Sequence, residues 1–184
     1  MIRCKNTLAT LGIATLGVAS LLLIPTASAA SARTSQTALA TLFSGTAQVE
    51  LQEHFAAEAV LAGLVGTNAA NLQESINGET YEWTTMYPGF ATVAAAEGCA
   101  DAATLFAEIA VDEGGHAAAY TLALDSLTDS AVRVPKPQTV DPVVITASTP
   151  ACTGQTQVNL LAAMHGEAFA YAKYTAYALQ AARH

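Results

Sequence analysis

Four glutamates fall on the apolar sides of expected helices, and two of them are followed by a histidine within about one turn. His116 comes three residues after Glu113, and His54 comes four residues after Glu50. Side chains with these spacings share a helix face, so each pair can hold one metal ion. An acid on an apolar face is costly to bury unless a positive charge meets it. These residue types therefore predict a metal site built from carboxylates and imidazoles.

The other two acids, Glu79 and Glu167, lie in a repeated pattern. Each follows a glycine, and each comes eight residues after an asparagine that precedes a leucine. On a helix of about 3.6 residues per turn, one side brings Glu79 together with apolar residues. These residues are Leu72, Ile76, Trp83 and Phe90. Two further helices are therefore expected to contribute one inward acid each.

A second repeat relates the two helices that carry Glu–His pairs. The pattern around Glu50 (Leu42-Phe43, Ala47) returns around Glu113 (Leu105-Phe106, Ala110). Ferritin-like four-helix bundles hold two iron or two manganese ions with two lone-Glu helices and two Glu-plus-His helices. Carboxylate oxygens with imidazoles suit iron or manganese better than copper or zinc. We expect an all-α, ferritin-like four-helix bundle with two iron ions, or manganese in their place.

Three more side chains lie one or two turns from these acids. Glu82 is one turn beyond Glu79 and is either an additional ligand or a solvated surface acid. Tyr87 and Tyr174 lie about two turns after Glu79 and Glu167. They either donate hydrogen bonds to ligand carboxylates, as a second layer around the site, or serve in ordinary packing.

Four helices and one long loop account for the bundle, which we expect over residues 36–184. Apolar periodicity predicts four helices. The first, second and fourth cover about 36–65, 69–97 and 156–184, and the third carries Phe106 and Leu124. Pro88 is expected to kink the second helix without ending it, and Asp101 to cap the third. Residues 129–155 contain four prolines and predict a crossover loop, with a short extended piece at 143–145.

The N-terminus resembles a secretory signal peptide, residues 1–29. Arg3 and Lys5 precede an apolar run over 8–24, and Ala27-Ser28-Ala29 follows it, so cleavage is expected after Ala29 or Ala32. The alternative is an uncleaved membrane anchor, because the run approaches spanning length. We expect export to the periplasm, cell envelope or medium, with no stable membrane insertion after cleavage.

Composition limits the classes of partner. The chain has 184 residues, 52% of them hydrophobic, and a formal net charge of -8. This suits one domain with a sizeable core. The acidic balance argues against binding nucleic acid or anionic lipid, both of which attract basic surfaces.

Two cysteines follow the signal segment, Cys99 and Cys152. In an oxidising compartment they either form a disulfide or remain free thiols. Cys99 lies at an expected helix–helix turn and Cys152 in the long loop, so neither is an obvious core residue. No CxxC pair occurs, which excludes a metal site built from such pairs.

The motifs resemble those of the rubrerythrin family. Gly78 to Glu82, Thr85 to Pro88 and Glu113 to His116 are similar to the second half of the rubrerythrin di-iron domain. Gly166 to Ala170, with Lys173-Tyr174, resembles its first helix, and Leu42 to Glu50 its second. The segment that resembles the first helix comes last, which indicates a circular permutation.

Two other departures from the family bear on the site. The family's Glu-x-x-His becomes a Glu50–His54 spacing that is one residue too long. Either a π-bulge restores His54 to the site, or Glu53 replaces it. The cysteine-built rubredoxin domain of many rubrerythrins is missing, so an unknown external electron donor is expected.

The resemblance implies a non-haem di-iron centre that reduces hydrogen peroxide, or oxidises ferrous iron with oxygen. Its implied ligands are Glu50, His54, Glu79, Glu82, Glu113, His116 and Glu167. An alternative is a protein that binds or sequesters iron or manganese without catalysis. A structural or adhesive module with relic acids is a third hypothesis, disfavoured because unpaired buried carboxylates destabilise a fold. The alanine-rich helix faces also permit a homodimer.

Overall fold

The computed structural model describes residues 27–183, with side chains described from residue 33 onward. The predicted signal peptide falls on residues 1–26 outside this range, apart from its last three positions. Within the described part, no helix combines the length and apolar character needed to cross a membrane. The chain divides into two units, residues 1–45 and 46–184, and the second contains all the side chains discussed below.

The first helical run comprises α1 (Ala27–Val49), the π-helix η1 (Glu50–Phe55) and α2 (Ala56–Ala62). Gly63 ends it with a φ of 64°, a left-handed conformation that glycine adopts at little cost. The sequence predicted an end near residue 65. The π-helix occupies the position where the extra residue between Glu50 and His54 predicted a π-bulge.

The second run comprises α3 (Asn68–Tyr81), a second π-helix η2 (Glu82–Met86) and α4 (Tyr87–Ala96). The Thr67 hydroxyl accepts a hydrogen bond of 3.2 Å from the backbone N–H of Ala70 and caps its start. Pro88 lies in the first turn of α4 and does not end the run, as predicted. Proline has no N–H to donate, so one backbone hydrogen bond of a regular α-helix is missing at Pro88. The wider π-helical turn of η2, which comes just before it, accommodates this loss.

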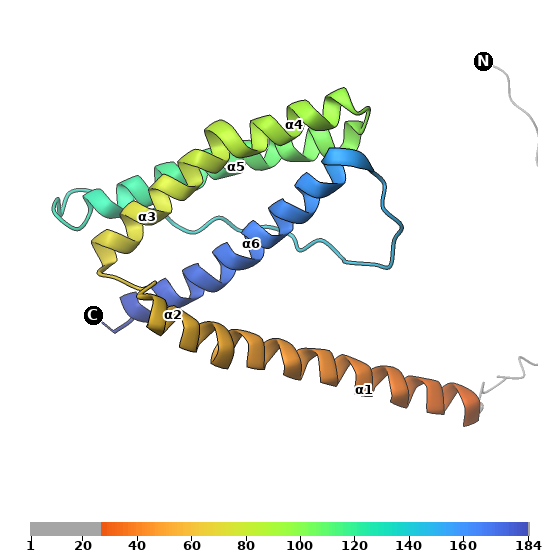
Figure 1. Cartoon of the computed structure of the whole chain (residues 1–184). Coiled ribbons are helices and arrows are strands. Elements are labelled where there is room, and N and C mark those ends of the chain that lie inside the picture. Colours follow the sequence, from red (N-terminus) through yellow and green to blue (C-terminus); the bar gives the residue numbers. More distant parts are fainter. Residues whose placement is uncertain (1–26, 184) are drawn as a thin grey trace, which may run out of the picture. The chain divides into compact units, whose positions relative to one another are not determined.

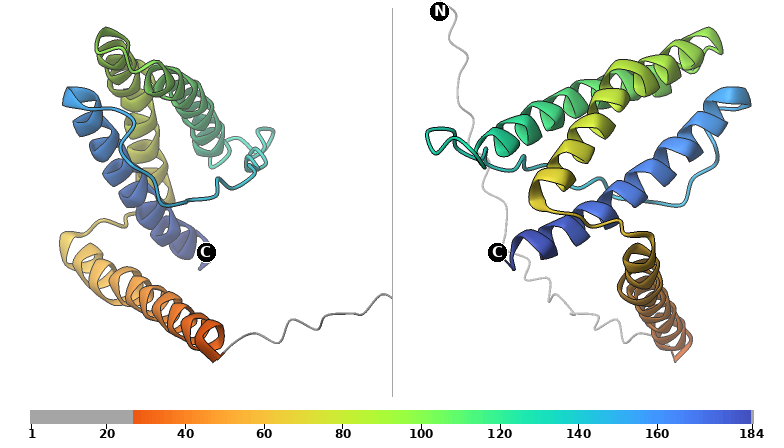
Figure 2. Two further views of the ribbon diagram at one scale, coloured as in Figure 1. Left: turned by 90° about the vertical axis from the view of Figure 1, so that its right-hand side faces the viewer. Right: turned by 60° about the vertical axis from the view of Figure 1, so that its left-hand side comes forward.

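Helix α5 (Ala100–Asp125) packs along α3 and α4, as the views in Figure 1 and Figure 2 show. Gly114 permits the close approach, since a Cβ there would lie 3.0 Å from the ring of Trp83. Tyr87 and Phe106 are fully buried between α4 and α5, with Phe90 against them. Cys99 precedes α5 without a side-chain cap, so the prediction that Asp101 is the N-cap was wrong.

The last helix, α6 (Gly154–Ala181), follows a long loop and is fastened at its start. A disulfide joins Cys99, before α5, to Cys152, before α6. The Glu97 carboxylate accepts hydrogen bonds from the backbone N–H groups of Gln155 (3.0 Å) and Thr156 (2.7 Å). The Thr156 hydroxyl donates a third, of 2.6 Å. These contacts connect the first turn of α6 to the α4–α5 turn.

The fold class is confirmed as all-α and ferritin-like. Residues 27–183 form helices and no strand, in four continuous helical runs with one long connection before α6. Residues 143–145, expected to form a short extended piece, are not part of a β-strand, and their side chains are largely exposed. Cys152, which was not an obvious core residue, is buried and forms the disulfide that was one of the two alternatives for these cysteines.

Replacing both Cys99 and Cys152 by serine should lower the free energy of unfolding by about 2–4 kcal/mol, because the disulfide restricts the unfolded chain. Urea denaturation followed by circular dichroism measures the change. Equal midpoints for the double variant and the parent would show that the bond does not stabilise the fold.

Candidate metal centre

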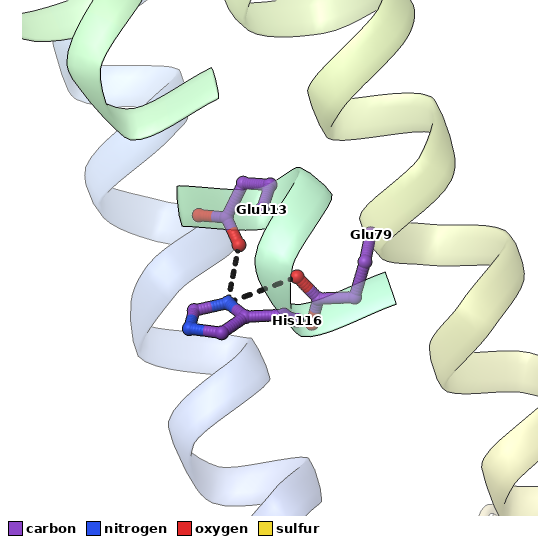
Figure 3. A group of neighbouring side chains, drawn as sticks. All are labelled: Glu79, Glu113 and His116. Carbon is purple, nitrogen blue, oxygen red and sulfur yellow. Dashed lines mark hydrogen bonds and ion pairs between the residues drawn. The ribbon is translucent and has the colours of Figure 1, made fainter. Parts of the chain in front are cut away.

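Three side chains from two packed helices form the centre of the site. Glu79 on α3 is 2% exposed and Glu113 on α5 is 5% exposed. His116 lies one turn after Glu113, and its Nδ1 is 2.7 Å from Glu113 Oε2 and 3.3 Å from Glu79 Oε2 (Figure 3). One donor atom from each of the three lies within 4.8 Å of the others, which is compatible with shared coordination of a cation.

A buried oxygen in this group lacks a partner. The shorter contact of His116 Nδ1 is with Glu113 Oε2, and within the described residues Glu79 Oε2 has no hydrogen-bond partner. The 3.3 Å separation from His116 is thus a charge contact without hydrogen-bond geometry. An unsatisfied buried carboxylate oxygen costs free energy that a bound cation would recover. The donor set therefore fits a metal ion that prefers oxygen and imidazole ligands.

The two acids titrate as a coupled pair. Burial opposes ionisation of Glu79, but nearby His116 and the Tyr174 hydroxyl outweigh it and lower its pKa. Burial and the neighbouring Glu79 raise the pKa of Glu113, against the opposing effect of His116. Contacts with the carboxylates of Glu113 and then Glu79 raise the pKa of His116 to about 10. In the metal-free state, this cluster therefore retains protons that a cation would have to displace.

Two tyrosines reach across to acids on the opposite helix. Tyr174 on α6 donates its hydroxyl to Glu79 Oε1, and Tyr87 on α4 donates to Glu167 Oε1 on α6. Burial, and then the hydrogen-bonded carboxylate, raise the pKa of both phenols well above the usual range. Both tyrosines thus stay protonated as donors. Hydrogen bonds to carboxylates, one of the two roles expected for these tyrosines, are therefore present.

Glu82 lies near the acids Glu79 and Glu167. Burial, followed by the charges of Glu79 and Glu167, raises its pKa to about 7. A Cβ on Gly166 would lie 4.0 Å from Glu82 Oε1, so this acid extends toward α6. The description of Glu82 as a solvated surface acid therefore does not fit its half-buried position.

Glu50 and His54 are not part of the group formed by Glu79, Glu113 and His116. Glu50 Oε2 and His54 Nδ1 are 3.0 Å apart, and both side chains are more than half exposed. Glu53, the proposed substitute for His54, is exposed on the same π-helix. The structure pairs Glu50 with His54 as the spacing suggested, and it brings Glu79, Glu113 and His116 together without them.

A buried cation lies beside the site, and the sequence did not predict a role for it. Lys173 on α6 is 6% exposed, and its Nζ is 3.1 Å from Glu74 Oε2. Its charge lowers the pKa of Glu82, against the larger effect of burial. A lysine next to the motif tyrosine Tyr174 was a visible signal, but its partner Glu74 is 99 residues away in the sequence.

The metal-free protein should lose stability as the pH rises from about 5 to about 8. Glu82 and Glu113 have raised pKa values, so their stabilisation is complete below the unfolded-state pKa of about 4.3 and is lost as the pH rises through the folded-state values. His116, with its raised pKa, contributes in the same direction above about pH 6.5. We expect a loss of about 1–3 kcal/mol, reduced by solvent screening at Glu82 and His116.

Urea denaturation at several pH values measures this slope. Glu113→Gln mimics the protonated acid and should flatten the profile, whereas Glu108→Gln, on the exposed side of the same helix, should leave it unchanged. A Glu113→Gln profile parallel to that of the parent would contradict the assignment.

Comparison with known proteins places this arrangement in a family. A family model described as Rubrerythrin matches residues 30–124, slightly more than half of the chain. A rubrerythrin from Porphyromonas gingivalis is 39% identical over 71 residues, covering 39% of this chain and 36% of the relative. A rubrerythrin from Nitratidesulfovibrio vulgaris is 47% identical over 55 residues, covering 30% and 29%.

The chain thus spans about a third of the length of these curated relatives. No solved structure matches it. The matched region includes Glu79, Glu113 and His116, which form the buried group, and also Glu50 and His54. This chain belongs to the rubrerythrin family.

Proposed function

We propose that this protein is a non-haem di-iron oxidoreductase that reduces hydrogen peroxide to water. The observation that carries the proposal is the buried Glu79 carboxylate, which has an unsatisfied oxygen and lies against Glu113 and His116. Membership of the rubrerythrin family, whose members bind two iron ions, supports iron as the metal. Manganese would use the same donors.

Residues from three helices would hold the metal. Glu79 and Glu113 supply carboxylates that can bridge, His116 supplies a nitrogen, and Glu82 and Glu167 supply further oxygens. A bound pair of iron ions would supply the redox chemistry and open positions for peroxide. Tyr174 and Tyr87 hold one oxygen of Glu79 and Glu167, respectively, and so orient the other oxygen of each acid.

We further propose that Glu50 and His54 complete the ligand set. Their mutual hydrogen bond gives them the preorganised pairing that Glu113 and His116 show inside the site. Exposure leaves both available to a metal.

Metal content decides between His54 and its alternative Glu53. Anaerobic loading with ferrous iron should give about two ions per chain for the parent and about one for His54→Ala, because one terminal nitrogen is lost. Glu53→Ala is the matched control and should retain both ions. The reverse result would assign the ligand to Glu53, and full occupancy in both variants would remove this π-helix from the site.

Two features of the gene product belong to the same proposal. Circular permutation is supported by the position of α6 outside the matched residues 30–124, although it carries Glu167 and Tyr174. Export is supported by the disulfide between Cys99 and Cys152, since such bonds persist mainly in oxidising compartments. An external electron donor would then be needed for turnover.

Stopped-flow oxidation of the diferrous protein tests the peroxidase assignment. Peroxide should oxidise it faster than oxygen by about tenfold or more, a difference of about 1.4 kcal/mol in barrier. Glu113→Gln should abolish the reaction, and Glu108→Gln should preserve it. Oxidation by oxygen at an equal rate would overturn the peroxidase assignment. One oxidation event without turnover, in the presence of a donor, would indicate iron binding or sequestration instead.

A further inference from the structure

Two tyrosines on one side of α6 connect the metal site to a second carboxylate. Tyr174 donates its hydroxyl to Glu79, and its ring centroid is 6.2 Å from that of Tyr177, one turn further on. The Tyr177 hydroxyl donates a hydrogen bond of 3.1 Å to Glu74 Oε2. The order of contacts is therefore Glu79, Tyr174, Tyr177 and Glu74.

Glu74 is held in place as a proton acceptor. The buried ammonium group of Lys173 lies 3.2 Å from its Oε1 and 3.1 Å from its Oε2. The Glu74 side chain is 51% exposed, so a proton received there can exchange with solvent. This carboxylate thus has one fixed phenol donor, one fixed cation and access to water.

The two phenols differ in how easily they can lose an electron. Lys173 Nζ lies 4.8 Å from the centroid of the Tyr174 ring, and a positive charge so close opposes formation of an electron-poor ring. The acceptor for the Tyr174 proton is Glu79, which is also the acid that would bind metal, and metal binding weakens a carboxylate as a base. Tyr177 has a separate acceptor, so the stable oxidised site should be Tyr177.

We propose that Tyr177 and Glu74 form a proton-coupled redox relay, which passes electrons one at a time through Tyr174 to the metal site. This inference rests on the proposed di-iron function. It assigns a route for the electrons that peroxide reduction consumes, and it places the entry point on α6 beside Glu74. A one-electron donor of small size, or a redox protein that docks there, would supply them.

Each passage balances in electrons and protons. The Tyr177 phenol loses one electron inward through Tyr174, and its O–H bond breaks as the proton moves to Glu74 Oε2. The neutral tyrosyl radical is then reduced by one electron from the external donor, and Glu74 returns the proton. Two passages supply the two electrons that convert one hydrogen peroxide, with two protons from solvent, into two waters.

Tyr120 provides an internal comparison. Its ring centroid is 5.4 Å from that of Tyr174, closer than Tyr177. Among the described residues no carboxylate accepts a hydrogen bond from the Tyr120 hydroxyl, whereas Glu74 accepts one from the Tyr177 hydroxyl. Burial, and then the charge of Glu79, raise the pKa of Tyr120 to about 12. The distance between rings alone would therefore make Tyr120 the oxidised residue. The carboxylate that can accept the phenol proton makes it Tyr177.

The test uses electron paramagnetic resonance of the full chain, loaded with ferrous iron, mixed with excess peroxide without a donor and freeze-quenched. The parent should show a tyrosyl radical that Tyr177→Phe and Glu74→Gln reduce by about tenfold or more, while Tyr120→Phe leaves it unchanged. Tyr171→Phe, an exposed position on the same helix, is a background control. A radical that persists in Tyr177→Phe but disappears in Tyr120→Phe would overturn the proposal.

A companion measurement on the metal-free protein separates this inference from the proposed function. Azide radicals generated by pulse radiolysis oxidise tyrosine directly, and the yield and solvent isotope effect at Tyr177 should depend on Glu74. If Glu74→Gln slows this oxidation by about tenfold, the relay exists even where iron fails to bind. Equal rates in parent and Glu74→Gln would refute it, whatever the result with peroxide.

Discussion

Burial of the Glu79 carboxylate is the constraint on which the rest of the site depends. A charged acid in this position requires partners, and α5 and α6 supply them through His116 and Tyr174. The Tyr174 hydroxyl donates a hydrogen bond to Oε1, while Oε2 has no hydrogen-bond partner because His116 Nδ1 lies closer to Glu113. The unsatisfied oxygen raises the free energy of the metal-free arrangement, and a cation bound there would lower it.

The position of α6 determines whether these partners reach the acids. Its first turn is attached to the α4–α5 turn through Glu97 and the Cys99–Cys152 disulfide. Further along, Tyr174 of α6 donates a hydrogen bond to Glu79 of α3, and Glu167 of α6 accepts one from Tyr87 of α4, so α6 is connected to both helices. A long connection, not a short hairpin, precedes α6, so these contacts are what fix its first turn against the α4–α5 turn.

The structure also changes the meaning of several sequence features. The extra residue between Glu50 and His54 became a π-helix, as local spacing predicted, yet this pair is separate from the buried group. Asp101 is a residue type that commonly caps a helix, but the N-cap of α5 is Cys99, two residues earlier. The β-branched residues at 143–145 remained a loop because a strand needs a neighbour. Local preference alone could not decide either case.

The sequence by itself determined the helical periodicity, the inward acids, the Glu–His spacings and the family motifs, because each is a property of residues within a few turns of one another. Only the tertiary structure decided which tyrosine meets which acid and which oxygen is unsatisfied, and it joined Lys173 and Tyr177 to Glu74. Those contacts link residues 80 to 103 positions apart. Such pairs depend on helix register and packing, which helical periodicity does not encode.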